Sequence, residues 1–119
     1  MSDGAVARDW VVERTGKWRE PDFPSSVYPT FPCGSGYVVS RNLHTWLADN
    51  ARHLHSFQGE DVSMGIWLAP LAPRLIQDKR WQCFKVCEDS MLSMPDLTPA
   101  EVTSHWYNKL HCVSPCRVC

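Results

Sequence analysis

Residues 28–65 decide the fold of this chain, and they contain YPTFPCGSGYVVS at 28–40 and GEDVSMG at 59–65. The first block is a loop by composition, because proline and glycine disfavour regular structure. The second block predicts a helix start, since its adjacent Glu and Asp suit the positive end of a helix macrodipole. Its last glycine, four residues after the Asp, indicates a place where another part of the chain approaches closely.

The pattern between and after these blocks predicts one short strand and two helices. Tyr37-Val38-Val39 is typical of a strand, and Ser40 is a favourable N-cap. A helix is expected over 41–54, because four apolar side chains share one face: Leu43, Trp46, Leu47 and Leu54. The second helix should begin near Glu60 and end before Pro70, with Val62, Ile66 and Ala69 as its buried stripe.

The flanking segments add little regular structure. Val11-Val12 predicts a short strand, and residues 74–86 read as extended or irregular. Thr98-Pro99-Ala100-Glu101 predicts a helix start, with Thr as N-cap, Pro at the first position and Glu completing a capping box. That helix should run to about Leu110 and bury Val102 and Trp106. The order of elements predicts a mixed α/β fold with too few strands for a complete nucleotide-binding sheet.

Composition narrows the class of protein. The chain has 119 residues, 44% apolar and 21% charged, with a net charge of −1. This charge gives no reason to expect a nucleic-acid or anionic-membrane partner. No run approaches the roughly 18 apolar residues of a membrane span, and the N-terminus lacks a signal-peptide pattern. We therefore expect any secretory signal or membrane anchor to lie outside this chain, which would make the chain a fragment.

Six cysteines point towards an oxidising compartment. Five lie near the C-terminus as C-x3-C … C-x3-C-x2-C: Cys83, Cys87, Cys112, Cys116 and Cys119. Disulfides are the favoured interpretation, and a structural zinc site or free buried thiols are the alternatives. We expect Cys83 and Cys87 to pair with two of the last three cysteines. Cys33 stands apart in the first block.

Glu60 and Asp61 are the candidates for acid–base chemistry. A carboxylate can remove a proton from an attacking hydroxyl if it reaches that hydroxyl within a partly desolvated cleft. Neighbouring side chains diverge on a helix, so only one of the two can face such a cleft. The alternative is ordinary acidic decoration of a helix N-terminus.

Two further blocks have both a functional and a structural interpretation. Gly34-Ser35-Gly36 is either a plain turn or a loop whose exposed backbone lies beside a sugar or phosphate. Lys17-Trp18 is either a substrate contact or, for the indole, core packing. The histidines make no metal pair with the acidic residues by spacing.

Taken together, these blocks resemble the C-terminal half of glycosyltransferase family 31, the β-1,3-galactosyltransferase superfamily. The motif is Tyr-Pro, a small-residue loop ending Gly-Tyr-Val, a helix, and an acidic pair before Val and Gly. The resemblance implies that Asp61 is the catalytic base, with Glu60 beside it. It also implies that the following residues bind substrate: Lys17, Trp18, Tyr28, Gly34, Ser35, Gly36 and Tyr37.

The resemblance further implies an α/β fold, the C-terminal half of a GT-A type glycosyltransferase domain with a cysteine-rich C-terminal lobe. Its parts would be an extended segment at 1–27, an acceptor and base core at 28–70, and a cysteine-rich helical tail at 71–119. Mn²⁺ would be the cofactor, with ligands upstream of this chain. Many members carry a metal-associated His where this chain has Pro95; Asp96 is the nearest substitute.

The implied activity is inverting transfer of N-acetylgalactosamine from UDP-N-acetylgalactosamine, in β-1,3 linkage, to a terminal N-acetylglucosamine. The acceptor would be a glycoprotein glycan of the O-mannosyl type, on the lumenal side of the endoplasmic reticulum or Golgi membrane. A cysteine-stapled or zinc-stabilised binding module without catalysis is the alternative. If the nucleotide side lies outside the chain, the chain alone should be inactive.

Overall fold

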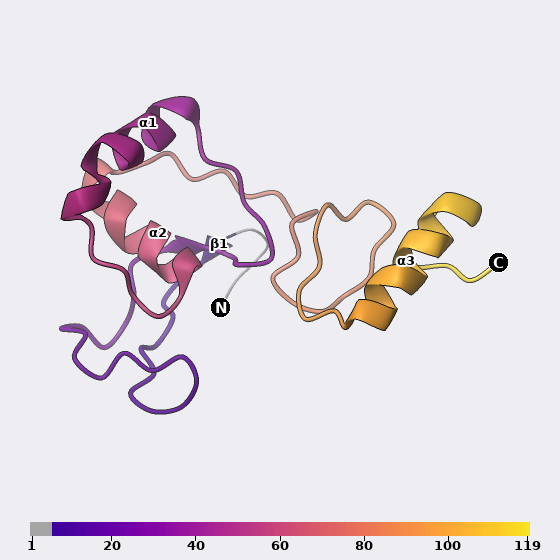
Figure 1. The fold of residues 1–119 in the computed structure, drawn as a ribbon, viewed down its shortest axis with the longest axis horizontal. Coiled ribbons are helices and arrows are strands. Elements are labelled where there is room, and N and C mark those ends of the chain that lie inside the picture. The colour runs from indigo at the N-terminus through magenta and orange to yellow at the C-terminus, as the bar shows by residue number, and fades with distance from the viewer. Residues whose placement is uncertain (1–5) are drawn as a thin grey trace.

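The computed structural model describes residues 6–119, which form two lobes joined by an extended link (Figure 1). The N-terminal lobe, residues 6–71, carries the sheet and helices α1 and α2, whereas the C-terminal lobe, residues 79–119, carries α3. The molecule is elongated, with extents of 50 × 35 × 24 Å. The elements in chain order are β1 Val6–Ala7, β2 Phe31–Pro32, α1 Arg41–Asn50, the 3-10 turn η1 Ala51–His53, α2 Glu60–Leu68, the 3-10 turn η2 Ala69–Leu71 and α3 Pro99–His111.

The core of the N-terminal lobe forms where α2 packs onto β2. A methyl group placed on Gly65 would lie 2.7 Å from the carbonyl oxygen of Thr30 and 2.8 Å from Cα of Phe31. Only a residue without a side chain allows this approach, so the close contact predicted for this glycine is confirmed. Around it, apolar side chains from the sheet, the N-terminal segment and α2 form one cluster: Ala7, Val12, Phe23, Tyr28, Phe31, Val62 and Ile66.

The helices of this lobe follow the predicted periodicity with two differences. Leu43, Trp46 and Leu47 share the half-buried face of α1, but the α-helix ends at Asn50 and a 3-10 turn follows. In α2 the predicted stripe was wrong at Ala69, which is exposed, and the helix buries Ser63, Gly65 and Leu68. Gly65 faces β2, where the helix approaches the sheet most closely, whereas the Ser63 hydroxyl donates to the carbonyl oxygen of Gly59 at 2.8 Å.

The strand predictions were mostly wrong. Val11 and Val12 form no strand, and Val11 makes only an isolated bridge to Val27. Residues 37–39 form no strand with any part of the chain that the structure describes, and Val38 is 80% exposed. The sheet that forms instead is antiparallel, with Val6 opposite Pro32 and Ala7 opposite Phe31.

Two further observations concern the N-cap of α1 and the N-terminal segment. Ser40 occupies the N-cap of α1, but its hydroxyl donates to the side chain of Asn42 and no side chain caps the helix.

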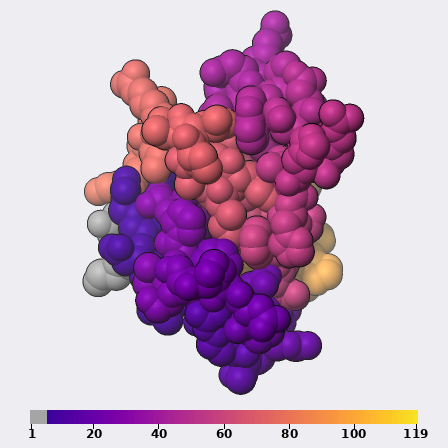
Figure 2. Space-filling model, turned by 90° about the vertical axis from the view of Figure 1, so that its left-hand side faces the viewer, coloured from indigo at the N-terminus to yellow at the C-terminus, as the bar shows by residue number. Residues whose placement is uncertain are grey.

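Of the predicted segment 1–27, residues 1–5 lie outside the described part of the chain. Figure 2 shows the rest of that segment forming the lower surface of the lobe, with the helical residues above it and the C-terminal lobe behind.

The C-terminal lobe is held by cross-links and polar contacts. The capping residue of α3 is confirmed, since Thr98 Oγ1 accepts a hydrogen bond from the backbone N–H of Glu101 at 3.2 Å. The expected burial of Val102 and Trp106 was wrong, as they are 52% and 63% exposed. The face of α3 that packs inward is polar: Asn108 is its buried residue.

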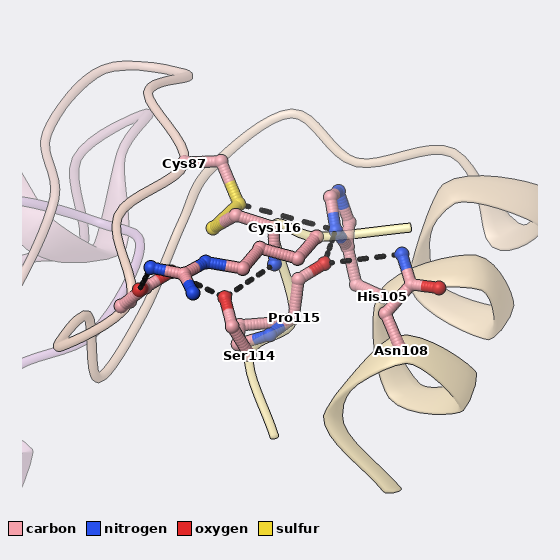
Figure 3. Close-up of a disulfide and its surroundings, with 8 residues drawn as sticks. Cys87, His105, Asn108, Ser114, Pro115 and Cys116 are labelled. Carbon is pink, nitrogen blue, oxygen red and sulfur yellow. Dashed lines mark hydrogen bonds and ion pairs between the residues drawn. A yellow bond between two sulfur atoms is a disulfide. The ribbon is translucent and has the colours of Figure 1, made fainter. Parts of the chain in front are cut away.

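Figure 3 shows how that polar face is anchored beside a disulfide. His105 Nδ1 donates to the carbonyl oxygen of Pro115 at 2.7 Å, and the Asn108 amide donates to the same oxygen at 3.4 Å. Ser114, which is buried, donates its hydroxyl to Asp89. The lobe therefore substitutes hydrogen bonds and cross-links for an apolar core, as small cysteine-rich modules commonly do.

All six cysteines form disulfides: Cys33–Cys83, Cys87–Cys116 and Cys112–Cys119. The predicted pairing of Cys87 with one of the last three cysteines is confirmed, but the predicted partner of Cys83 was wrong. Cys83 instead bonds to Cys33 in the other lobe. Neither zinc coordination by thiolates nor free thiols agrees with this arrangement, because no cysteine is free.

The two lobes meet along a short strap, residues 81–84, which lies against the loop 33–36. Besides the Cys33–Cys83 disulfide, the hydroxyl of Ser35 donates to the carbonyl oxygen of Gln82. The Trp81 ring approaches Gly36 so closely that a methyl group there would lie 2.9 Å from Cζ3. The described residues thus form a mixed α/β structure whose halves are covalently stapled.

We expect Gly65→Ala to lower the free energy of unfolding by about 1–3 kcal/mol, because the new methyl group forces α2 away from β2. Urea denaturation followed by circular dichroism measures this change. Thr45→Ala, on the exposed face of α1, is the control and should stay within about 0.5 kcal/mol of the unaltered chain. Equal stability of both variants would contradict the close contact.

We also expect the disulfides to differ in their contributions. In the chain-entropy model, Cys33–Cys83 closes a 50-residue separation and is worth about 4 kcal/mol, whereas Cys112–Cys119 closes seven residues and is worth about 2 kcal/mol. Replacing each pair with serines and comparing denaturation curves tests the order. Non-reducing peptide mapping that yields other pairings would refute the connectivity.

Candidate functional site

A cleft of about 220 Å³ lies between the two lobes at the N-terminal end of α2. Asp61, Trp18, Tyr28 and Gly34, all predicted from the sequence, line it together. A larger hollow of about 680 Å³ lies between the helices and residues 72–76, and its lining is mainly apolar. Only the smaller cleft contains Asp61, so we take it as the candidate site.

Asp61 is held in a narrow space in the first turn of α2. Its Oδ1 accepts a hydrogen bond from the backbone N–H of Val62 at 2.8 Å. A methyl group on Gly34 would lie 2.9 Å from Oδ2, and one on Gly59 would lie 2.7 Å from Oδ1. Glycine at both positions therefore leaves room for the carboxylate, which side chains there would displace.

Glu60 does not share the cleft with Asp61. Its Oε2 accepts a hydrogen bond from the hydroxyl of Tyr37 at 2.9 Å. The two carboxylates thus diverge, as neighbouring helical positions require. Burial, together with the hydrogen bond and the negative charge of Glu60, raises the pKa of Tyr37 to about 12.

The loop 34–36 divides between the cleft and the strap. Gly34 lines the cleft, whereas Ser35 and Gly36 face the strap through Gln82 and Trp81. In the described structure these two residues join the lobes. The structure therefore does not place these two predicted substrate-binding residues in the cleft with Asp61.

Of the other predicted contacts, Trp18 and Tyr28 line the cleft, whereas Lys17 and Tyr37 are not among its lining residues. Trp18 is 52% exposed at the cleft, and Nζ of Lys17 sits 4.5 Å from the centroid of its ring. Tyr28 is buried, with its ring 4.9 Å from that of Phe23, so it belongs to the core as well as to the cleft lining. Burial raises the pKa of Tyr28, and the negative charge of Glu20 adds to the effect.

Several residues that line the cleft were not predicted from the sequence, among them Trp10, Glu13 and Phe84. Trp10 is 41% exposed and packs edge-on to Phe31 at 6.2 Å. Glu13 brings a second carboxylate to the cleft lining. Phe84 directly follows Cys83 in the sequence. Only the disulfide between Cys83 and Cys33 shows that this position brings Phe84 to the cleft.

The described residues do not fit a Mn²⁺ centre. Within residues 6–119 no group of three or more His, Cys, Asp and Glu side chains gathers as metal ligands would. Asp96 is exposed in a left-handed conformation, with φ of 62°. The same part of the chain has no helix of the length and apolarity that crossing a membrane requires.

The chain belongs to the galactosyltransferase family, whose model matches residues 1–78. It is 52% identical to human UDP-GalNAc:beta-1,3-N-acetylgalactosaminyltransferase 2 over 96% of this chain and 23% of the relative. The Danio rerio protein of the same name is 51% identical over 95% of this chain and 23% of its own length.

A more distant relative is the Arabidopsis thaliana hydroxyproline O-galactosyltransferase GALT2, which is 44% identical over 46% of this chain and 9% of the relative. The chain thus spans about a quarter of the length of its curated relatives in animals. No solved structure matches the chain. The GT-A architecture therefore stays a prediction.

We expect Glu60→Gln to lower the pKa of Tyr37 from about 12 part of the way towards 10, because it removes the negative charge but not the burial. Ultraviolet absorbance of tyrosinate measures the titration, with Tyr37→Phe identifying the transition. A raised pKa favours the protonated phenol in the folded state, so this stabilisation is present below pH 10 and is lost as the pH rises towards 12. An unchanged transition in Glu60→Gln would contradict the contact.

Proposed function

We propose that the protein containing this chain is an inverting β-1,3-glycosyltransferase. Its donor is UDP-N-acetylgalactosamine, and its acceptor is a terminal N-acetylglucosamine on a glycoprotein glycan of the O-mannosyl type. The observation that carries the proposal is the cleft in which the Asp61 carboxylate lies close to Gly34 and Gly59. The chain is also 52% identical to the human UDP-GalNAc:beta-1,3-N-acetylgalactosaminyltransferase 2. Lumenal residence in the endoplasmic reticulum or Golgi, through an anchor outside this chain, agrees with three disulfides.

The residues of the chain support the acceptor half of this reaction. Asp61 takes the proton of the acceptor hydroxyl as its oxygen bonds to the anomeric carbon of the donor sugar. The bond from that carbon to the diphosphate breaks on the opposite side, which inverts the configuration. A base positioned in this way typically contributes two to four decades of rate.

Glu60 has a supporting role in this proposal. Its hydrogen bond to Tyr37 ties the first turn of α2 to the segment that leads into α1. The residues described here do not fit the expected Mn²⁺, so we propose that its ligands belong to another part of the complete protein. A binding module without catalysis is the remaining alternative, and sugar binding without turnover would favour it.

The test uses the human relative with this chain in place of its matching segment. Asp61→Asn should keep donor binding but lower kcat about 100-fold or more, because the proton acceptor is gone. Glu60→Gln should be milder, and Asp49→Asn, on the exposed face of α1, should leave kcat unchanged. Retention of more than about a tenth of the activity by Asp61→Asn would exclude it as the base.

The same assay separates the proposal from its alternatives. The 119-residue chain alone, with UDP-N-acetylgalactosamine, Mn²⁺ and a β-N-acetylglucosaminide, should give no product above a buffer blank. Metal-dependent product from it would mean that a complete site lies within these residues. An inactive hybrid that folds and secretes normally would refute the proposed transferase.

A further inference from the structure

We propose that Phe84, which belongs to the C-terminal lobe, forms one wall of the acceptor subsite and selects the acceptor sugar by packing against its apolar face. The inference rests on the proposed function, because it assigns the acceptor to the cleft beside Asp61. It gives the cysteine-rich lobe a part in recognition beyond stabilising the fold.

The first argument is the way in which the strap holds Phe84. Three successive contacts fix residues 81–83 against the loop that carries Gly34: the approach of Trp81 to Gly36, the hydrogen bond from Ser35 to Gln82, and the Cys33–Cys83 disulfide. Phe84 follows directly after this anchored segment. Its backbone is therefore held at the edge of the cleft, beside the loop whose Gly34 abuts the Asp61 carboxylate.

The second argument is exposure. Phe84 lines the cleft yet is 55% exposed, and Trp10 and Trp18, which line the same cleft, are 41% and 52% exposed. An aromatic side chain buries a large apolar area when it is covered, so leaving one open to water forgoes stability. Three such rings in the lining of one cleft indicate a surface that a ligand covers.

The third argument is chemical fit. A β-linked pyranose such as N-acetylglucosamine carries its hydroxyls at the ring edge and presents only C–H groups on each face. Those faces pack well on aromatic rings, while Asp61 and Glu13 can accept hydrogen bonds from hydroxyls at the edge. The cleft, at about 220 Å³, is smaller than the 300–1,000 Å³ typical of pockets for drug-sized ligands, which suits one sugar ring.

A binding experiment on the 119-residue chain tests the wall without requiring turnover. Methyl β-N-acetylglucosaminide is titrated into the chain, and binding is followed by nuclear magnetic resonance. Phe84→Ala should weaken binding about tenfold, the scale of one aromatic contact, and Phe84→Tyr should restore it. Val86→Ala is the matched control, since Val86 is exposed on the same segment but does not line the cleft.

The disulfide supplies a second, independent variant. Replacing Cys33 and Cys83 with serines should also weaken binding, because it frees the strap. Combined with Phe84→Ala it should add little further loss, since both changes act through one ring. Full additivity of the two would show that the disulfide acts by another route and would overturn the proposed wall.

Kinetics of the human hybrid separate this inference from the proposed function. Phe84→Ala should raise KM for the acceptor about tenfold while leaving KM for UDP-N-acetylgalactosamine unchanged. If the chain fails to bind the glycoside, or Phe84→Ala binds and reacts like the unaltered protein, the inference is wrong. If binding depends on Phe84 but the hybrid is inactive, the wall stands as a sugar site and the transferase proposal falls.

Discussion

The close approach of α2 to β2 at Gly65 is the contact on which the rest of the structure depends. This contact places α2 so near the sheet that Val62 and Ile66 join the core. The first turn of α2 then directs Asp61 towards the loop that follows β2. The interior around it is small, and few large side chains are buried. A single methyl group at this point would move both the core and the carboxylate.

The second constraint is covalent. The C-terminal lobe buries Asn108 and Ser114 but has no large buried apolar side chain within the described residues, so an apolar core contributes little to it. Three disulfides and the hydrogen bonds around Pro115 hold it instead. Because one of those disulfides reaches Cys33, the lobe is fixed beside the cleft, where it supplies Phe84.

Glycine serves three different purposes around the site. Gly65 allows a helix to reach a strand, and Gly34 and Gly59 leave room for the Asp61 carboxylate. Gly36 admits the Trp81 ring and thereby joins the lobes, in a conformation with φ of 153°. The glycines of the two sequence blocks therefore allow close packing at three places: the Asp61 carboxylate, the strap and the core.

Local patterns by themselves determined the helices, the divergence of Glu60 and Asp61 and the cap at Thr98, because periodicity and capping act within a few residues. Only the tertiary structure decided the strand pairing, the partner of Cys83 and the exposure of Trp106. Each of these depends on segments far apart in sequence, such as Cys33 and Cys83, whose meeting no local pattern encodes. The cleft follows the same rule: its carboxylate was predictable from two adjacent residues, but its aromatic walls come from three separate segments that folding brings together.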